Sequence, residues 1–261
     1  MCLILLAHKI HPSYRLILAA NRDEFYDRPT APAAFREDAP DVLAGRDQRA
    51  GGTWLGITRT GRLAAITNYR DPASIKDHAP SRGELVSNFL LGTDPPKIYL
   101  RRLDGKADEY NGFNLILGDR QALYWYSSRA SEIRALEPGI YGLSNHLLDT
   151  PWPKVARGKE ALRRLLAEQG SVSPEALFAL LSDRSRPDDA DLPDTGVGLE
   201  LERLLSPLFI TSPDYGTRSS TILTIDERER VHFSERTFNA KPEHATTVSF
   251  EFQIASQELG S

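Results

Sequence analysis

The order of strand-like and helix-like segments most constrains the fold of this chain. Short apolar runs typical of β-strands come in pairs joined by turns, and amphipathic helical segments lie between these pairs as blocks. A doubly wound nucleotide-binding fold requires a regular alternation of strand and helix, which the sequence lacks. The pattern therefore predicts an α+β protein whose sheets are mainly antiparallel.

Paired apolar runs predict the individual strands. The first pair, residues 2–7 and 15–20, is joined by the turn-like sequence His11-Pro12-Ser13 and should form a buried hairpin. Residues 21–40 contain repeated prolines, and we expect an irregular segment there. The remaining predicted strands are residues 53–58, 63–67, 113–117, 123–126, 140–144, 219–225, 231–238 and 246–254.

Helix signals fall between the strand pairs. Ser81 and Glu84 have the spacing of a capping box ahead of an apolar stretch, which predicts a helix start. Apolar residues recur at helical spacing over residues 153–167, and another helix should begin after Ser173-Pro174. Residues 199–205 are weakly helical.

Length and composition narrow the class of protein. The 261 residues are 40% hydrophobic, with no internal repeat and no long linker, so we expect a single domain spanning residues 1–261. The net charge is -4 without a basic block, which argues against nucleic acid as a partner. No apolar run is long enough to cross a bilayer, so we expect no stable membrane insertion.

Cysteine and histidine usage bears on compartment and metal binding. A single cysteine excludes an internal disulfide and any multi-cysteine metal centre, and it suits a reducing compartment. The N-terminal apolar run lacks the flanks of a signal peptide, so we expect a cytoplasmic protein. The histidines are dispersed, and the acidic residues of 188–194 lack calcium-loop spacing, so we expect no metal site.

The only cysteine, Cys2, follows Met1 and opens the first predicted strand. Removal of Met1, expected because residue 2 is small, would leave one residue with both a thiol and a free α-amine. The amine titrates near ~8 and the thiol near ~8.5, so the neutral amine can accept the thiol proton. Cys2 is therefore a candidate nucleophile. The alternative is a small buried cysteine that happens to lie early in the chain.

Polar side chains stand where several predicted strands end. Amides at such ends could stabilise an oxyanion, a carboxylate could orient the amine, and a guanidinium could lower the pKa of the thiol. Each also has a simpler explanation, because Asn and Asp favour turns and Arg favours surfaces. These candidates are Asn21, Arg22, Asp23, Asn68, Arg70, Asn145 and Arg218.

A set of short motifs spread from residue 1 to about residue 250 resembles one known family. The combination is highly specific and is similar to the NRDE family, whose animal members are the transport and Golgi organisation protein 2 homologues. The motifs are Met1-Cys2, Ala20-Asn21-Arg22-Asp23-Glu24-Phe25, Gly52-Thr53-Trp54-Leu55-Gly56, Thr67-Asn68-Tyr69-Arg70, Gly142-Leu143-Ser144-Asn145, Leu192-Pro193-Asp194-Thr195-Gly196 and Gly216-Thr217-Arg218-Ser219-Ser220-Thr221.

The resemblance implies an N-terminal-nucleophile (Ntn) hydrolase-like fold, a four-layer αββα sandwich with two mainly antiparallel sheets. Within that fold the nearest chemistry resembles the penicillin V acylase and bile salt hydrolase group. On that likeness Cys2 matches the nucleophile and Asp23 the residue that holds its amine. Asn68 and Asn145 match the asparagines near the nucleophile and the oxyanion, and Arg218 matches a late arginine.

One position departs from that group, which has an arginine three residues before the aspartate. Here that position is Ala20, and Arg22 instead stands next to Asp23. This departure bears on how the thiol would be activated.

Two functional hypotheses follow. In the first, the protein hydrolyses a non-peptide C–N amide bond through a thioester on Cys2 and requires no cofactor, with Asn21, Arg22 and Arg70 as substrate-binding residues. In the second, the same cleft carries haem or an acyl thioester, such as an acyl-CoA or lipid, without turnover, and Cys2 is an axial thiolate to haem. The expected partners are therefore a small-molecule amide, an acyl thioester or haem.

Overall fold

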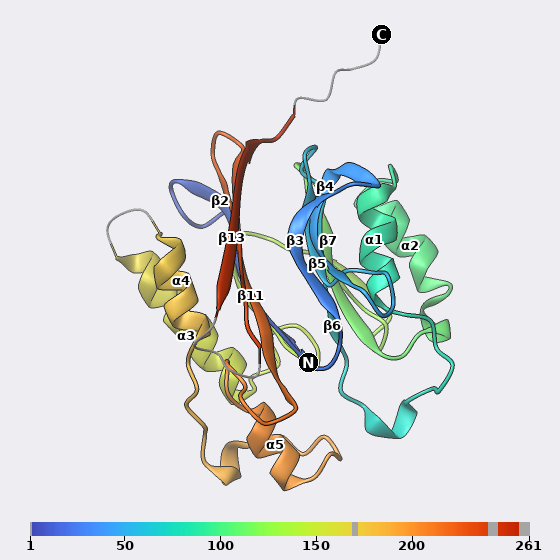
Figure 1. Ribbon diagram of the computed structural model, residues 1–261, viewed down its shortest axis with the longest axis vertical. Helices are drawn as coiled ribbons and strands as arrows, with labels where there is room; N and C mark the ends of the chain where they lie inside the picture. The colour runs from blue at the N-terminus through green and yellow to red at the C-terminus, as the bar shows by residue number, and fades with distance from the viewer. Residues whose placement is uncertain (1, 169–171, 240–244, 256–261) are drawn as a thin grey trace.

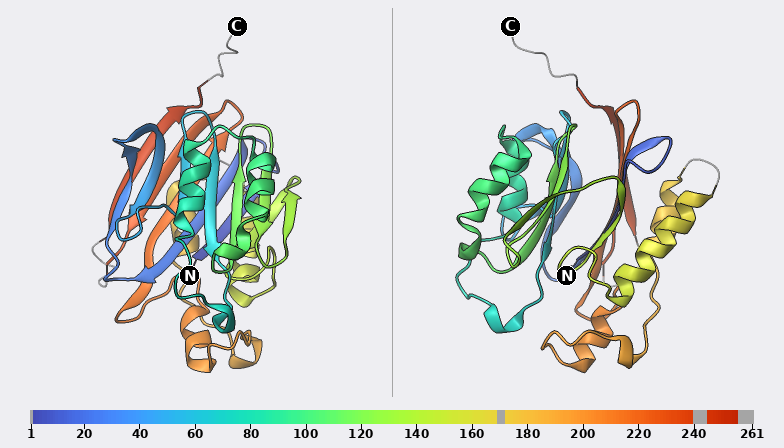
Figure 2. Two further views of the ribbon diagram at one scale, coloured as in Figure 1. Left: turned by 90° about the vertical axis from the view of Figure 1, so that its right-hand side faces the viewer. Right: turned by 180° about the vertical axis from the view of Figure 1, so that it is seen from behind.

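The computed structural model describes residues 2–168, 172–239 and 245–255. Two β-sheets pack face to face, and helices cover both outer faces (Figures 1 and 2). This arrangement confirms the predicted α+β sandwich with antiparallel sheets. In the described part of the chain, no helix is both long and apolar enough to cross a membrane.

The first sheet has six strands in the order β10-β1-β2-β11-β12-β13, and every pair is antiparallel. The predicted N-terminal hairpin lies within it, flanked by β10 on one side and by the three C-terminal strands on the other. Its strands are β1 (Cys2–His8), β2 (Tyr14–Phe25), β10 (Gly139–Leu143), β11 (Tyr215–Asp226), β12 (Arg230–Thr237) and β13 (Thr246–Gln253).

The second sheet has seven strands that follow sequence order from β3 to β9, all antiparallel. Short turns and one helical excursion connect them. These strands are β3 (Thr30–Arg36), β4 (Ala39–Asp47), β5 (Leu55–Thr58), β6 (Leu63–Asn68), β7 (Phe113–Gly118), β8 (Leu123–Ser127) and β9 (Glu132–Ala135).

The helices cover opposite outer faces of the sandwich (Figure 2). α1 (Gly83–Leu91) and α2 (Pro96–Asp104) lie on the seven-stranded sheet, and α3 (Pro153–Ala167) and α4 (Pro174–Leu181) lie on the six-stranded sheet. A fifth helix, α5 (Leu199–Leu205), lies beyond the sandwich at the end where the chain begins (Figure 1). Short 3-10 turns span Pro72–Ser74, Ala107–Glu109 and Asp189–Asp191.

Strand β1 shows why the sequence gives this layering. Leu3 and Leu5 pack against the helices, whereas Ile4 and Leu6 pack between the two sheets, and all four are buried. A strand covered on both faces is apolar at every position rather than at alternate positions, which matches the continuous apolar run in the sequence. Cys2 therefore stands at the end of a strand fixed on both sides.

The helix-start predictions have different outcomes. Ser173 is the N-cap of α4, and its hydroxyl accepts a hydrogen bond from the backbone N–H of Ala176 at 3.1 Å. The helix predicted from Ser81 and Glu84 is confirmed as α1, but the capping box is wrong, because α1 begins at Gly83 and its N-cap, Arg82, makes no capping bond. Helix α2 and strand β9 were not predicted at all.

The expectation of an irregular segment over residues 21–40 is also wrong. β2 continues to Phe25, and β3 and β4 occupy most of the remainder. Pro32 lies in β3, an edge strand with a register shift between Ala31 and Ala34. Edge strands and bulges tolerate proline because no ladder hydrogen bond is lost there, so proline was a poor guide here.

Candidate functional site

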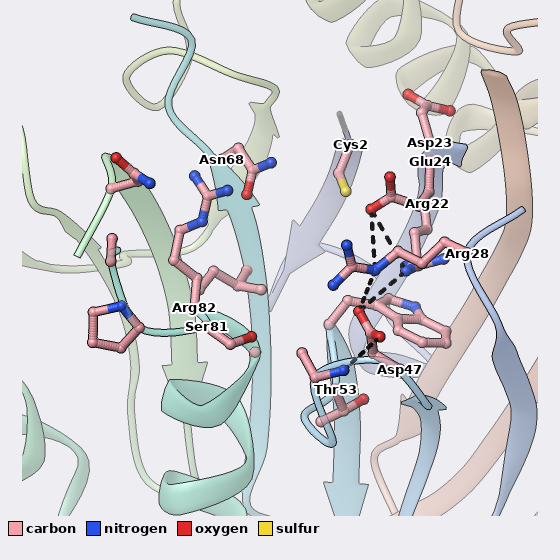
Figure 3. A pocket seen from close by; sticks show the side chains of 17 residues that line it. Cys2, Arg22, Asp23, Glu24, Arg28, Asp47, Thr53, Asn68, Ser81 and Arg82 are labelled. Atoms are coloured by element: carbon pink, nitrogen blue, oxygen red, sulfur yellow. Dashed lines mark hydrogen bonds and ion pairs between the residues drawn. The ribbon is translucent and has the colours of Figure 1, made fainter. Parts of the chain in front are cut away.

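The functional candidates gather at a cavity of about 340 Å³ that Cys2 lines at the end of β1 (Figure 3). Both sheets contribute to its wall, together with the segment that leads into α1. We call it the Cys2 cavity. Its lining residues are Cys2, Arg22, Asp23, Glu24, Arg28, Asp47, Ala50, Thr53, Trp54, Ile66, Asn68, Ala79, Pro80, Ser81, Arg82, Gly83 and Asn111.

Cys2 is partly buried, and its backbone pairs with Arg22 of β2. Burial raises the pKa of the Cys2 thiol, and the neighbouring Asp23 carboxylate acts in the same direction, whereas Arg22 opposes them. The resting sulfur therefore favours the protonated form, because a thiolate is poorly solvated there. Met1 lies outside the described residues, so its removal stays a prediction.

Arg22 lies on the same face of the sheet as Cys2. Its Nη2 stands 3.8 Å from Glu24 Oε2 and 3.7 Å from Asp47 Oδ2, and its guanidinium lies 4.4 Å from the centre of the Trp54 ring. Arg28 also uses Asp47, with Nε donating to Oδ2 at 2.7 Å. The two arginines and two carboxylates therefore form a network on one wall of the cavity.

Ala20, the position at which the acylase group has an arginine, faces the apolar core between the sheets opposite Ile4. Side chains on a strand alternate between faces, so Ala20 and Arg22 share one face. The guanidinium nearest to this position on β2 is that of Arg22, two residues later on the same face and directly across from Cys2.

Asp23 is almost fully buried, at 2% exposure, and its Oδ1 accepts a hydrogen bond from Thr217 Oγ1 at 2.7 Å. Burial raises the pKa of this carboxyl, whereas Lys154 and the Thr217 hydrogen bond lower it. Asp23 thus interacts with the thiol of Cys2 and with a positive charge supplied by α3.

That positive charge is Lys154, which sequence reasoning missed. Only 2% of the residue is exposed, and its Nζ donates to the backbone carbonyl of Leu205 at 3.0 Å. Burial lowers the pKa of Lys154 to about 8, although Asp23 partly opposes this shift. Its position four residues before the buried Gly158 was the signal that could have identified it, since this spacing places a lysine on the buried helix face.

Asn68 lines the cavity, whereas Asn145 lies behind the lining residues. Asn68 lines the Cys2 cavity at the end of β6, and its side-chain amide makes no hydrogen bond with the described residues. Asn145 is completely buried, and its Nδ2 donates to the backbone carbonyl of Asn68 at 2.9 Å. The adjacent Ser144 hydroxyl donates to the carbonyl of Cys2 at 3.1 Å. This segment therefore holds the backbones of both cavity residues.

Arg218 does not line the Cys2 cavity. Its Nη1 donates to the carbonyls of Phe25, Tyr26 and Arg28 at 2.8, 2.9 and 3.1 Å. The register between β2 and β11 shifts between Thr217 and Ser219, and such a bulge redirects the side chain at that point. Arg218 thereby stabilises the backbone at the end of β2 and just beyond it.

Asn21 and Arg70, two predicted substrate-binding residues, also lie outside the Cys2 cavity. Asn21 donates to the carbonyls of Leu181 and Leu208 at 2.9 and 2.8 Å, on the helix-covered face of the sheet. Arg70 forms a buried ion pair with Glu202 of α5, with Nη1 and Oε2 separated by 2.5 Å. Both side chains hold elements together in this structure.

Arg82 is a cavity residue that sequence reasoning did not single out. It precedes α1, and its Nη1 donates to the carbonyl of Gly112 at 3.0 Å. Nothing in its sequence context marked it as functional, because it reaches the site only through the packing of α1 on the seven-stranded sheet. Among residues 2–168, 172–239 and 245–255, no group of three or more His, Cys, Asp or Glu side chains could hold a metal ion.

Both the sequence and the fold resemble those of known proteins. The profile of a family described as Transport and Golgi organisation 2 matches residues 1–240. The Transport and Golgi organization protein 2 homolog of Bos taurus is 38% identical over 277 residues, covering 98% of this chain and 100% of its own. The Homo sapiens homolog is 37% identical over the same shares. Among solved structures, the C2A mutant of the conjugated bile acid hydrolase from Clostridium perfringens matches with a TM-score of 0.51 and 8% identity, covering 100% of both chains. That likeness confirms the Ntn-hydrolase-like fold.

Proposed function

The chain belongs to the Transport and Golgi organisation 2 family, and from this premise we propose that it hydrolyses a non-peptide C–N amide bond with Cys2 as the nucleophile. The observation that carries the proposal is the place of Cys2 itself. The thiol of the first strand lines a cavity together with the buried Asp23 and the unengaged amide of Asn68. The structural neighbour is a hydrolase named for a mutation at its own cysteine 2, which is consistent with this reading.

The proposed reaction begins once Met1 is removed. The free amine of Cys2 takes the thiol proton, and the sulfur attacks the amide carbonyl to form a C–S bond. The C–N bond then breaks as the ammonium returns its proton to the leaving amine. Water attacks the thioester and the amine accepts the water proton. Cleavage of the C–S bond then releases the acid, and the ammonium returns its proton to the sulfur of Cys2. Because burial raises the pKa of the thiol, the adjacent base is needed for each attack.

Three groups assist these steps. The carboxylate of Asp23 orients the Cys2 amine, with its own position fixed by Thr217. The Asn68 amide, which lines the cavity, donates to the oxyanion of the tetrahedral intermediate. Arg22, directly across from Cys2, supplies the positive field that Ala20 does not. Asn145 and Arg218 act as positioning residues through the backbones they bind.

The experiment that tests this proposal measures the alkylation rate of Cys2 by iodoacetamide against pH, in wild type and Asp23→Asn. Protein with Met1 removed is used. The variant should fold but react more slowly with a displaced pH profile, because the amine loses a charge-assisted hydrogen bond worth roughly 1.5–3 kcal/mol.

Glu235→Gln is the matched control. Glu235 is another buried carboxylate of the same sheet, and it accepts a hydrogen bond from the backbone N–H of Ala33 at 2.7 Å. This change should cost stability while leaving the carboxylate that orients the Cys2 amine in place. Rate profiles of Asp23→Asn that superimpose on those of wild type would retire the catalytic role of Asp23.

A second candidate is a carrier that holds haem or an acyl thioester in the Cys2 cavity without turnover. One observation favours it. Two of the five predicted catalytic residues, Asn145 and Arg218, donate hydrogen bonds to backbone carbonyls of the protein. Haem would contact the thiol of Cys2, so hemin should give a Soret band that changes in Cys2→Ala. An identical spectrum in the variant would leave haem without a thiolate ligand.

A further inference from the structure

The charges of the Cys2 cavity are not all compensated. Arg22 and Arg28 share the carboxylates of Glu24 and Asp47, as the dashed lines of Figure 3 mark. Arg82, the third arginine of the lining, makes no ion pair within the part of the chain that the structure describes. The cavity therefore holds one cation without a carboxylate of its own.

Arg82 is held in place for contact with a ligand. Its bond to the Gly112 carbonyl fixes one nitrogen of the guanidinium, and Gly112 is itself anchored by the backbone N–H of Tyr69 at 2.8 Å. The guanidinium extends into the cavity on the side away from Cys2 (Figure 3). An arginine presents five N–H donors in a fixed fork, so most of its donors remain for a bound group.

Burial around Arg82 makes this cation costly. Loss of hydration lowers the pKa of the guanidinium, and the nearby Cys2 and Glu24 partly offset that shift. A partly desolvated guanidinium gains most from an anion that brings a bidentate acceptor. Asn68, on the same wall, adds an unengaged amide beside it.

We propose that the Cys2 cavity takes a substrate with an anionic group, a carboxylate or a phosphate, which pairs with Arg82 while its carbonyl carbon lies at the sulfur of Cys2. This names the substrate class of the hydrolase proposed above and rests on that function for its catalytic meaning. The anion site itself holds whether the bound molecule is cleaved or only carried.

The test uses Cys2 as a reporter, because it is the only cysteine of the chain. Alkylation rates are measured with N-(iodoacetyl)glycine and with its neutral analogue N-(iodoacetyl)glycinamide, each divided by the rate with glutathione. A longer pair, 4-(iodoacetamido)butyrate and its amide, covers a greater span between sulfur and guanidinium. In each case the sulfur forms a C–S bond, iodide leaves and the thiol proton passes to the buffer.

Wild type should react faster with the anionic member of at least one pair, and Arg82→Gln should lower this preference by roughly tenfold. Arg82→Lys retains the positive charge but loses the forked N–H donors, so it should retain part of the preference for the anionic reagent. Arg28→Gln is the matched control: it removes a cation from the same cavity, but one already paired with Asp47. A preference that Arg82→Gln and Arg28→Gln change equally, or that neither changes, overturns the proposal.

A second measurement decides the matter if Cys2 reacts too slowly. The rise in Tm is compared for N-acetylglycine, N-acetylglycinamide and inorganic phosphate, in wild type and Arg82→Gln. A rise with N-acetylglycine alone assigns a carboxylate and a rise with phosphate alone assigns a phosphate, provided the variant loses it. No Arg82-dependent rise with either anion overturns the anion site. If wild type shows the anion preference but hydrolyses no amide, only the hydrolase proposal is overturned.

Discussion

The buried ammonium of Lys154 makes a prediction about stability against pH. Burial lowers the pKa of Lys154 from 10.5 to about 8, with only 2% of the residue exposed. Each pKa unit corresponds to ~1.4 kcal/mol, so burial of the charged form costs roughly 3 kcal/mol. This cost is fully present below pH 8, where both folded and unfolded chains carry the proton.

The sign follows from which state binds the proton. Between pH 8 and pH 10.5 the folded chain has released it and the unfolded chain still holds it, so stability rises with pH. Lys154→Met lacks this group. The free energy of unfolding of wild type, minus that of Lys154→Met, should therefore increase by roughly 3 kcal/mol across this interval.

Urea unfolding followed by tryptophan fluorescence at several pH values measures this difference. Lys159→Met is the matched control, because it removes a lysine from the same helix whose ammonium is paired with Asp149 at 2.6 Å outside the core. Stability curves of wild type and Lys154→Met that stay parallel from pH 8 to pH 10.5 would refute the argument. Such a result would mean that water or a neighbouring carboxylate compensates the charge of Lys154.

Two further substitutions test whether predicted substrate-binding residues are structural. Glu202→Gln leaves the guanidinium of Arg70 buried without its carboxylate, so urea unfolding should show a loss of roughly 3–5 kcal/mol while the thiol alkylates as before. Asn21→Ala removes the donors of two buried carbonyls and should cost about 2 kcal/mol or more, again with unchanged thiol kinetics. If a variant keeps its stability but alkylates at a different rate, the residue it tests acts on the site rather than on the fold.

The sequence predicts those features that local patterns control. The continuous apolar run of β1 indicated a strand buried on both faces, and Ser173 marked the start of α4. The helical spacing over residues 153–167 matched the bounds of α3. The segment 21–40 was misjudged because proline is tolerated at an edge strand, and an edge is a property of the assembled sheet.

The site was harder to predict, because strand position does not reveal side-chain direction. Asn21 and Arg22 are neighbours in sequence, yet one bonds to the helix layer and the other lines the cavity. Side chains alternate along β2, so the two point to opposite faces, and the register with β1 places Arg22 opposite Cys2. The bulge that turns Arg218 away has no sequence signature of its own. Arg82 and Lys154 approach the site through the packing of α1 and α3 on the sheets, and the local sequence shows at most that a side chain is buried, not what it approaches.

The central claim, that Cys2 acts as an N-terminal nucleophile, is tested most directly by intact-mass measurement on protein made in its native host. The protein is measured alone and after brief exposure to an activated acyl ester that also carries a carboxylate. We expect a mass that lacks Met1, and a single acyl group on wild type that water removes with time and that Cys2→Ala does not acquire. A chain that retains Met1, or an acyl group equally abundant on Cys2→Ala, would contradict the account.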